Sequence, residues 1–336
     1  MITRALRRLG LSLLVLWAVV TLAFVINHVL PGDPARLMAG PQARPADVEK
    51  LRRELGTDRP LAAQYASFTS RLVHTGPRAI AKGDKPHASC SAFAIVHVDL
   101  GVSFQHRKPV ARLIGERLPA TALLASMAVA FEVLLAVGLG LLAARWRRTI
   151  VDDGVMAVSL LLASVPTFLT AVVLQVVFAY RLRWLPFDGA GEGAASTLAH
   201  AVLPALTLAL YGAGWAIRLV RDEVISELGK PYVRTARAKG AGQVRVLLAH
   251  AMRNVALPLV TLVGLDLGAL LGGAIVTERI FRWPGVGSLA IDAVVTRDGP
   301  VIMGTVIVAS AGIVAANLAV DGLVGLIDPR TRRAAA

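Results

Sequence analysis

The sequence contains a single cysteine, Cys90, among 336 residues. No disulfide can therefore form within the chain, and no cage of several cysteines can hold zinc or an iron–sulfur cluster. Aromatic residues are also scarce, at 5% of the chain, although 55% of all residues are hydrophobic. The hydrophobic residues are gathered in long unbroken runs, which is typical of membrane proteins rather than of soluble domains.

Motifs for phosphate binding and for hydrolysis are missing as well. The chain holds no Gly-x-x-x-x-Gly-Lys-Ser/Thr loop, which cradles nucleotide phosphates, and neither His-Glu-x-x-His nor Gly-x-Ser-x-Gly. The sequence therefore predicts a chain that is not itself an ATPase, has no catalytic residues and uses no cofactor.

Long apolar runs are what the sequence does contain. A helix needs about 20 apolar residues to cross the hydrocarbon of a membrane. Runs of this length predict an all-α membrane protein with about six spanning helices, at 9–30, 118–143, 154–180, 198–217, 255–277 and 301–327. Proline within these runs, as at Pro166 and Pro204, is compatible with membrane helices because neighbouring helices re-satisfy the freed backbone groups.

The first run follows Arg4, Arg7 and Arg8, and such a basic start also occurs in cleaved signal peptides. Its apolar part is too long for a signal-peptide core, and it ends at 27–33 without a small-x-small cleavage site. We therefore expect residues 1–30 to form an uncleaved transmembrane helix.

Basic residues outnumber acidic ones, 36 against 22, and their placement predicts the orientation of the chain. The short segments on one side of the expected spans hold 17 Lys and Arg, and those on the other side hold 5. The positive-inside rule then places both termini and segment 218–254 in the cytoplasm, with the long segment 31–117 outside. This placement accounts for the net charge of +14 without any nucleic-acid partner.

The expected spans divide the chain into consecutive parts. These are a first helix at 1–30, an external segment at 31–117, a transmembrane core at 118–327 with its cytoplasmic loop at 218–254, and a cytoplasmic tail at 328–336. Within the external segment, the apolar spacing over 46–72 predicts helix. Residues 75–98 mix glycine, proline and polar residues, which indicates an irregular insertion.

The cytoplasmic loop contains a short segment with an unusual face. Val233, Ala236 and Gly240 share one side of a predicted helix and make it small and nearly smooth, with basic residues off that side. Gly240 and Gly242 then favour a sharp break before a second helix. A small face with a basic rim suits a groove on a partner protein, although a basic helix can also lie on lipid headgroups.

The same loop, with other segments in order, resembles the inner-membrane permeases of binding-protein-dependent ABC importers, in particular the dipeptide/oligopeptide/nickel branch. The resemblance covers nearly the whole chain. It is carried by Leu30 to Pro34, Leu51 to Gly56 with Pro60, Asp99 to Gly101 with Ser103, Pro109-Val110, Arg117 to Thr121, Ser164 to Phe168, Leu185-Pro186, Tyr232 to Gly240, His250, Arg253-Asn254, Gly272-Gly273, Glu278, Phe281, Pro284-Gly285, Gly287, Asp321 and Asp328 to Arg330.

This resemblance implies a type I importer permease fold, with the first helix and an external segment added to the core, in a bacterial inner membrane. The implied partners are a second permease, two ATPase subunits and an external substrate-binding protein. The implied cargo is a short peptide, with nickel chelates or another small solute as the alternative. The residues implied to couple to the ATPases are Tyr232, Val233, Arg234, Thr235, Ala236, Arg237, Lys239 and Gly240. The usual Glu-Ala-Ala start of this loop is replaced here by Arg234, Thr235 and Ala236, and residues 75–98 match no part of the family.

Two groups of residues within the spans carry further expectations. Gly264, Gly268 and Gly272 are spaced by four, so that another helix can approach closely, either within this chain or from a second permease. Glu132 and Asp266 are acidic residues in apolar runs and are candidates for lining the substrate path or relaying protons. Asp321 is better explained as a carboxylate near the cytoplasmic interface.

Other functions have weaker support in the sequence. His87, Cys90, His97, Asp99 and His106 crowd the external segment, but no tight metal motif joins them, so we expect no metal site. A stand-alone secondary transporter would show paired repeats and a midplane ion site, and no internal repeat is visible. A simple membrane anchor would not explain the acidic residues inside the spans.

Overall fold

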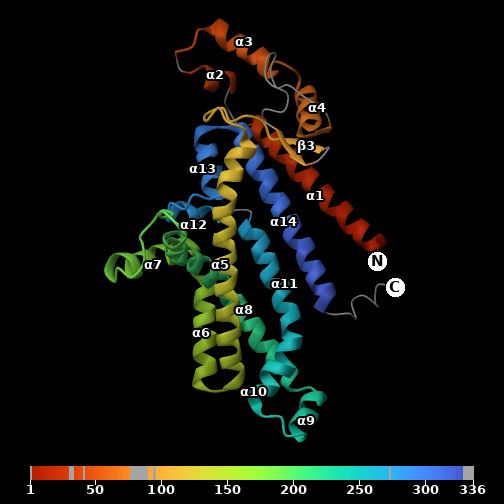
Figure 1. The fold of residues 1–336 in the computed structure, drawn as a ribbon, viewed down its shortest axis with the longest axis vertical. Coiled ribbons are helices and arrows are strands. Elements are labelled where there is room, and N and C mark those ends of the chain that lie inside the picture. Colours follow the sequence, from red (N-terminus) through yellow and green to blue (C-terminus); the bar gives the residue numbers. More distant parts are fainter. Residues whose placement is uncertain are drawn as a thin grey trace. The chain divides into compact units, whose positions relative to one another are not determined.

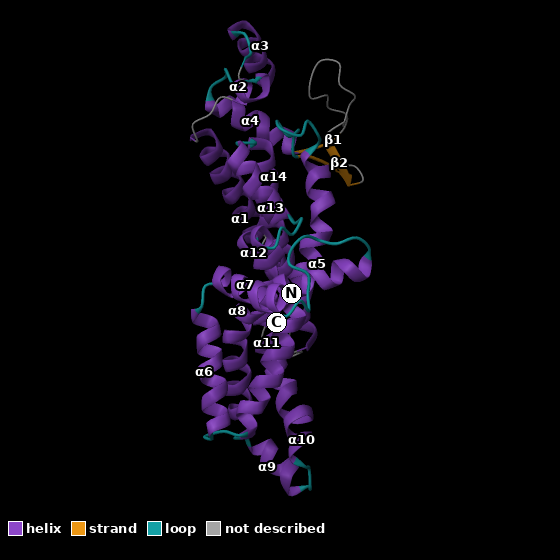
Figure 2. Cartoon of the chain, turned by 90° about the vertical axis from the view of Figure 1, so that its left-hand side faces the viewer, coloured by secondary structure: helices purple, strands orange, loops and turns teal. Residues whose placement is uncertain are grey.

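The computed structural model describes residues 2–29, 34–40, 42–75, 90–93, 96–271 and 274–327. The described chain is predominantly helical, with its strands confined to one small sheet (Figure 2). It divides into two compact units. The larger unit comprises 1–7, 120–284 and 312–336, and the smaller unit comprises 8–119 and 285–311.

The smaller unit contains most of the first helix and the external segment. Helix α1 (Ile2–Val29) is followed by α2 (Pro34–Ala39), α3 (Pro45–Leu55) and α4 (Leu61–Leu72). Tyr65 of α4 shares a hydrogen bond of 2.6 Å with Thr21 and packs against the ring of Phe24, which joins α4 to α1. The helix predicted over 46–72 is thus two helices, because Gly56 ends α3 with a φ of 70°, a conformation that favours glycine.

A three-stranded antiparallel sheet lies in the region predicted to be irregular. Its strands are β1 (Val73–Thr75), β2 (Cys90–Phe93) and β3 (Val96–Asp99), in the order β1-β3-β2, with Val73 opposite Val98 and Cys90 opposite Asp99. For its described parts, the prediction of an irregular insertion over 75–98 is therefore wrong. Residues 76–89 and 94–95 of that segment lie outside the described chain.

Apolar packing and one buried carboxylate hold the rest of the smaller unit. The first turns of α5 (Val110–Arg145) pack against α13 (Val286–Thr296) and the start of α14 (Gly299–Ile327). Asp298, between α13 and α14, accepts hydrogen bonds from the Ser103 hydroxyl at 2.5 Å and from the backbone N–H groups of Phe104 and Gln105, both at 3.1 Å. This carboxylate fixes the loop that leads into α5.

The larger unit is a bundle built around one long helix, α8 (Ala194–Leu228). Helices α6 (Ile150–Ser164) and α11 (Met252–Leu271) both lie along α8, as Figure 1 shows. The apolar core of this unit contains three buried residues from different helices, Ala136 of α5, Val220 of α8 and Val255 of α11. The remaining elements of this unit are α7 (Thr167–Leu174), the π-helix η1 (Gln175–Arg181), α9 (Pro231–Ala238), α10 (Gln243–Arg245), the π-helix η2 (Val246–Ala251) and α12 (Ile275–Ile280).

Four described helices are long and apolar enough to cross a membrane, namely α5, α8, α11 and α14. A fifth candidate is the bent pair of α6 with α7 and η1. The apolar stretch described in α1, Gly10–Ile26, is shorter than these, so a sixth span at 9–30 stays a prediction. The spans expected at 118–143 and 301–327 fall within α5 and α14.

The expected third span, 154–180, is not one continuous helix. Helices α6 and α7 meet at an angle of 106°. The bend falls at Val165, which has extended backbone angles (φ −79°, ψ 127°), because the residue before a proline is disfavoured in the helical region and Pro166 follows. Pro166 therefore marks a break between two helices in this candidate span.

Candidate functional site

The loop that the sequence predicts to be cytoplasmic contains a short helix followed by a glycine break. Helix α9 begins with Pro231, whose fixed φ suits a first helical turn. The helix ends at Ala238, and Gly240, two residues later, has a φ of +82°, while the N–H of Ala241 donates to the carbonyl of Ala236 at 3.1 Å. This is the break predicted from Gly240. A Cβ at this position would meet no atom within 4 Å, so the requirement for glycine comes from the backbone and not from crowding.

The predicted smooth face of α9 does not lie open along its length. Val233 is fully buried within the chain, Ala236 is half-buried, and Gly240 is exposed. The side chain of Val233 is packed within the chain itself, with η2 among the elements that contact α9, so a contact of Val233 with a partner stays a prediction. The exposed side of α9 carries Tyr232, Arg234, Thr235 and Arg237, followed by Lys239.

A buried carboxylate holds α9 in place. Glu227, near the end of α8, is only 4% exposed and accepts hydrogen bonds from the Tyr232 hydroxyl at 2.5 Å and the Asn254 side-chain amide at 2.9 Å. Lys230 forms an ion pair with the same carboxylate. The amide of Asn254 also donates to the Tyr232 oxygen at 3.0 Å. Together these contacts connect α9 to the end of α8 and the start of α11.

The hydroxyl of Tyr232 stays protonated in this arrangement. Burial raises the pKa of Tyr232, and its hydrogen bond to the Glu227 carboxylate raises it further. A protonated hydroxyl can donate to Glu227 while it accepts from Asn254, so both contacts hold at once.

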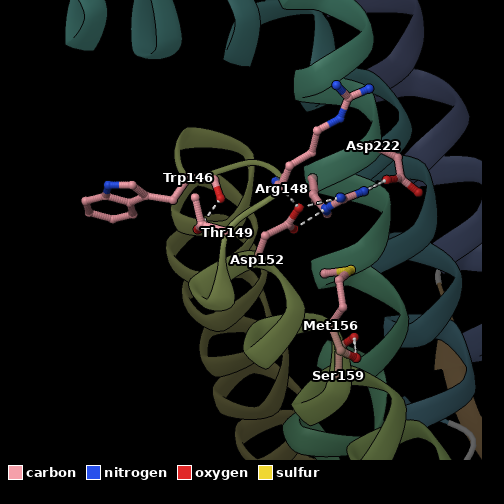
Figure 3. A network of polar contacts seen from close by, with 8 residues as sticks. Trp146, Arg148, Thr149, Asp152, Met156, Ser159 and Asp222 are labelled. Carbon is pink, nitrogen blue, oxygen red and sulfur yellow. Dashed lines mark hydrogen bonds and ion pairs between the residues drawn. The ribbon is translucent and has the colours of Figure 1, made fainter.

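A second polar contact connects the start of α6 to α8 (Figure 3). The guanidinium of Arg221 binds Asp152 with two hydrogen bonds, Nε to Oδ1 at 2.6 Å and Nη2 to Oδ2 at 2.7 Å. The backbone N–H of Arg148 donates to Asp152 at 2.9 Å, and Nη1 of Arg221 reaches Asp222 at 2.7 Å. This bidentate pair fixes both the distance and the orientation between the Arg221 and Asp152 side chains. Asp152 is buried.

The spaced glycines of α11 face another helix of the same unit. A Cβ on Gly264 would lie 1.9 Å from Cγ2 of Val320, and one on Gly268 would lie 3.2 Å from Cβ of Ala316. Both partners belong to α14. Of the two contacts that the sequence allowed, the structure thus shows the one within the chain. Gly272 lies outside the described residues.

The acidic residues expected inside the spans fall into two groups. Glu132 of α5 is buried against Gly212 of α8, and Asp266 of α11 is half-buried. Asp321 of α14 is exposed. A role of Glu132 and Asp266 in lining a path stays a prediction.

Hydrogen bonds join α5 to the segment around α12, which lies far away in the sequence. The Thr121 hydroxyl donates to the buried Glu278 carboxylate at 3.0 Å, and Nε1 of Trp283 donates to the carbonyl of Ala120 at 3.0 Å. These contacts join α5 to α12 and to the turn after it. Some of the residues that carry the family resemblance at 117–121 therefore contact residues that carry it at 278–285.

The crowded histidines of the external segment are described only in part. Within the described part of the chain, no group of three His, Cys, Asp or Glu side chains is arranged to hold a metal ion. His87 and the side chain of Cys90 lie outside that part.

Sequence reasoning missed Asp152, Arg221, Glu227 and Asp298, all of which hold elements together. Each is a single charged residue near a helix end with no recurring spacing, so periodicity could not select it.

Comparison with known proteins agrees with the family suggested by the sequence. Residues 136–333 match the family described as binding-protein-dependent transport system inner membrane component, and residues 1–125 match its N-terminal component. The chain belongs to this family. It is the permease subunit of an ABC importer, a multi-pass inner-membrane protein that works with ATPase and substrate-binding subunits.

Curated relatives align along almost the entire chain. A putative peptide transport system permease protein of Brucella abortus (strain 2308) is 36% identical over 330 residues, covering 97% of this chain and 98% of the relative. The glutathione transport system permease protein GsiC of Escherichia coli (strain K12) is 37% identical over 317 residues, covering 94% of each.

One solved structure shares the fold. A chain of the inward-facing MetNI methionine ABC transporter aligns with a TM-score of 0.51 and 15% identity, covering 66% of this chain and 98% of that one. The architecture is therefore the all-α type I importer permease fold, with the external segment and its small sheet added.

Proposed function

We propose that this permease carries short peptides across the inner membrane, together with a second, non-identical permease and two ATPase subunits. The observation that supports this most strongly is the near full-length match to two sets of relatives, one named for peptide transport and one for glutathione, itself a short peptide. The chain has no phosphate-binding loop, so ATP hydrolysis belongs to its partners.

The exposed side of α9 is the proposed docking point for an ATPase subunit. Tyr232, Arg234, Thr235, Arg237 and Lys239 are available there, with Ala236 at its edge. Val233 and the Glu227 contacts hold α9 against the rest of the unit, and Gly240 provides the turn. A push on α9 would therefore be passed to α8 and α11 rather than absorbed by a loose loop.

The orientation follows from the charge distribution. Both termini, the tail 328–336 and segment 218–254 lie in the cytoplasm, the helix 1–30 spans the membrane, 31–117 is external, and 118–327 forms the transport core. Single cysteines at Ala43 and Ala241, in a Cys90→Ser background, should be labelled from opposite sides of intact membranes. Labelling of both from outside would refute this orientation.

The cargo is tested with the complete importer in proteoliposomes. Labelled di- and tripeptides should be taken up in an ATP-dependent manner when the binding protein is added, and the permease without ATPase subunits should hydrolyse no ATP. Uptake of nickel chelates with no peptide uptake would move the assignment to the other arm of this branch.

The docking point is tested by reversing charge on the exposed side of α9. Arg234→Glu and Arg237→Glu should each reduce co-purification of the ATPase subunits and uptake, while the permease still inserts. Arg245→Glu is the matched control, because Arg245 is exposed but lies beyond the glycine break. Unchanged assembly in both α9 variants would show that the ATPase binds elsewhere.

A further inference from the structure

The short turn between α5 and α6 carries positive charge and exposed apolar side chains together. Arg145, Arg147 and Arg148 follow one another closely in the chain, and all three are exposed. Beside them, Trp146 is 44% exposed and Ile150 is 90% exposed. The ring of Trp146 points away from the helices in Figure 3. The turn therefore presents cationic and apolar groups side by side.

The arginine side chains of this turn form no ion pair with a carboxylate in the described part of the chain. Asp152 is already bound to α8 and takes only the backbone N–H of Arg148 from the turn. The guanidinium of Arg145 lies over the Trp146 ring, 5.7 Å from its centre. A guanidinium in that position uses its face, and the N–H groups along its edge can still bind an anion. Asp153 is the one other acid nearby and is exposed, so the turn keeps an excess of positive charge.

The open face of α8 marks the level in the membrane at which this turn lies. Trp215 is 53% exposed, and the guanidinium of Arg218 lies over its ring, 4.5 Å from the centre. Asp222, one turn further along α8, is exposed. Aromatic side chains gather at the boundary between hydrocarbon and headgroups, so charged groups beyond Trp215 lie among the headgroups. Because Arg221 binds Asp152 at the start of α6, the turn before α6 lies at this headgroup level.

We propose that the turn at 145–150 binds the headgroup of an anionic phospholipid. Its three guanidinium groups bind the phosphate, whose oxygen atoms match the paired N–H groups of arginine. Trp146 and Ile150 rest against the first carbons of the acyl chains, directly below the phosphate. A phospholipid offers this combination of an anion and a hydrocarbon surface at one level of the membrane. A zwitterionic headgroup brings its own cation, which offsets the attraction, so an anionic lipid is preferred.

This site goes beyond the proposed function, since it depends neither on the solute carried nor on the side of the membrane that the turn faces. Helix α6 begins directly after the turn and is joined to α8 by the Asp152–Arg221 pair. A headgroup bound only by the folded turn stabilises this end of the bundle by mass action. The lipid composition of the membrane therefore acts on the contact between α6 and α8.

Native mass spectrometry of the assembled transporter, titrated with phosphatidylglycerol or phosphatidylcholine, tests the site. The wild-type complex should bind phosphatidylglycerol in preference. Arg147→Gln combined with Arg148→Gln should weaken the tightest phosphatidylglycerol binding about 30-fold, because each basic residue near an anionic headgroup contributes about fivefold. Binding of phosphatidylcholine should not change. Arg181→Gln combined with Arg183→Gln is the matched control, since this exposed pair of the same unit also includes one arginine with a positive φ.

Two further measurements identify the ligand as a membrane lipid. Phosphatidylglycerol with brominated acyl chains should quench the fluorescence of Trp146, seen as the difference between the wild type and Trp146→Phe in vesicles. Inorganic phosphate at millimolar concentration should not displace the lipid. Wild-type affinity for phosphatidylglycerol in the Arg147/Arg148 variant, or an equal loss in the control pair, would overturn the proposal. Displacement by inorganic phosphate would assign the turn to a free anion, and loss of the ATPase subunits with unchanged lipid binding would assign it to those subunits.

Discussion

Two helix contacts in the larger unit are made by opposite means. Toward its C-terminal end, α8 is joined to α6 by the Asp152–Arg221 pair, a directional contact between full charges. Within the bundle, α11 is joined to α14 by Gly264 against Val320, a contact made by the absence of a side chain. The first contact depends on two charged side chains, and the second depends on the lack of a side chain at Gly264.

The difference follows from the solvent around each contact. In lipid there is little hydrophobic drive to press helices together, so close packing of small residues supplies the attraction. Near the membrane surface, a charged pair can be assembled with water close by, and its geometry selects one orientation. Each contact is therefore sensitive to a different kind of substitution.

Removing one charge should have the largest effect. Asp152→Asn takes the anion from Arg221, and breaking a buried pair by removing one partner costs typically about 3–5 kcal/mol. Because Arg221 is partly exposed, we expect about 3 kcal/mol, seen as a large drop in the thermal stability of the purified permease. Asp153→Asn is the control, since Asp153 is an exposed neighbour on the same helix. Equal losses in the two variants would mean that the pair contributes nothing specific.

Filling the glycine contact should come next. Gly264→Ala places a Cβ 1.9 Å from Val320, so α11 and α14 must move apart at a cost of about 1–3 kcal/mol for overpacking. Val320→Ala in the same chain should restore most of the thermal stability by removing the clashing methyl group. Gly322→Ala, with no atom within 4 Å of the new Cβ, should lose nothing. A failure of Val320→Ala to rescue would place the damage elsewhere.

Removing one hydroxyl from the α9 contacts should have a smaller effect. Tyr232→Phe deletes a hydrogen bond to Glu227 but leaves Lys230 and Asn254 in place, so we expect about 1 kcal/mol and faster hydrogen exchange in α9. Tyr180→Phe is the matched control, because Tyr180 is 71% exposed. Unaltered exchange in α9 would show that Glu227 does not hold this helix through Tyr232.

The smallest effect is expected one turn further along α11. Gly268→Ala brings the new Cβ to 3.2 Å from the Cβ of Ala316, a tight contact that needs only a small adjustment. Alanine also favours helix over glycine by about 1 kcal/mol, which offsets that adjustment. Thermal stability should stay close to wild type, and a loss as large as that of Gly264→Ala would show that the packing is uniformly rigid.

The sequence predicts best those features that depend on neighbouring residues. The apolar runs at 118–143 and 301–327 and the break at Gly240 follow from local composition and backbone preference, and all three are present. The bend at Val165 was not predicted, although Pro166 was evident, because a proline in a membrane helix can be absorbed or can break the helix depending on its neighbours.

Features that depend on distant residues could not be predicted. The three short strands have too few residues for a period-two pattern to emerge, and their order is set by pairing across the sheet. Glu227 meets Tyr232 and Asn254 only because α8 and α11 pack side by side. Glu132 was recognised as a costly group in a membrane, but nothing in the sequence indicates that it is buried against Gly212 of α8.

The length of α8 has a mechanical consequence. Its 35 residues span about 50 Å at about 1.5 Å per residue, whereas the hydrocarbon of a membrane is about 30 Å thick. About 20 Å of helix, counted over both ends, therefore lies beyond the hydrocarbon, and Arg221 and Glu227 belong to the C-terminal end. Such a rod acts as a lever, and a tilt of about 10° in the bilayer moves its tip by about 3–4 Å. Conversely, a displacement of that size at the tip would reorient the whole helix within the membrane.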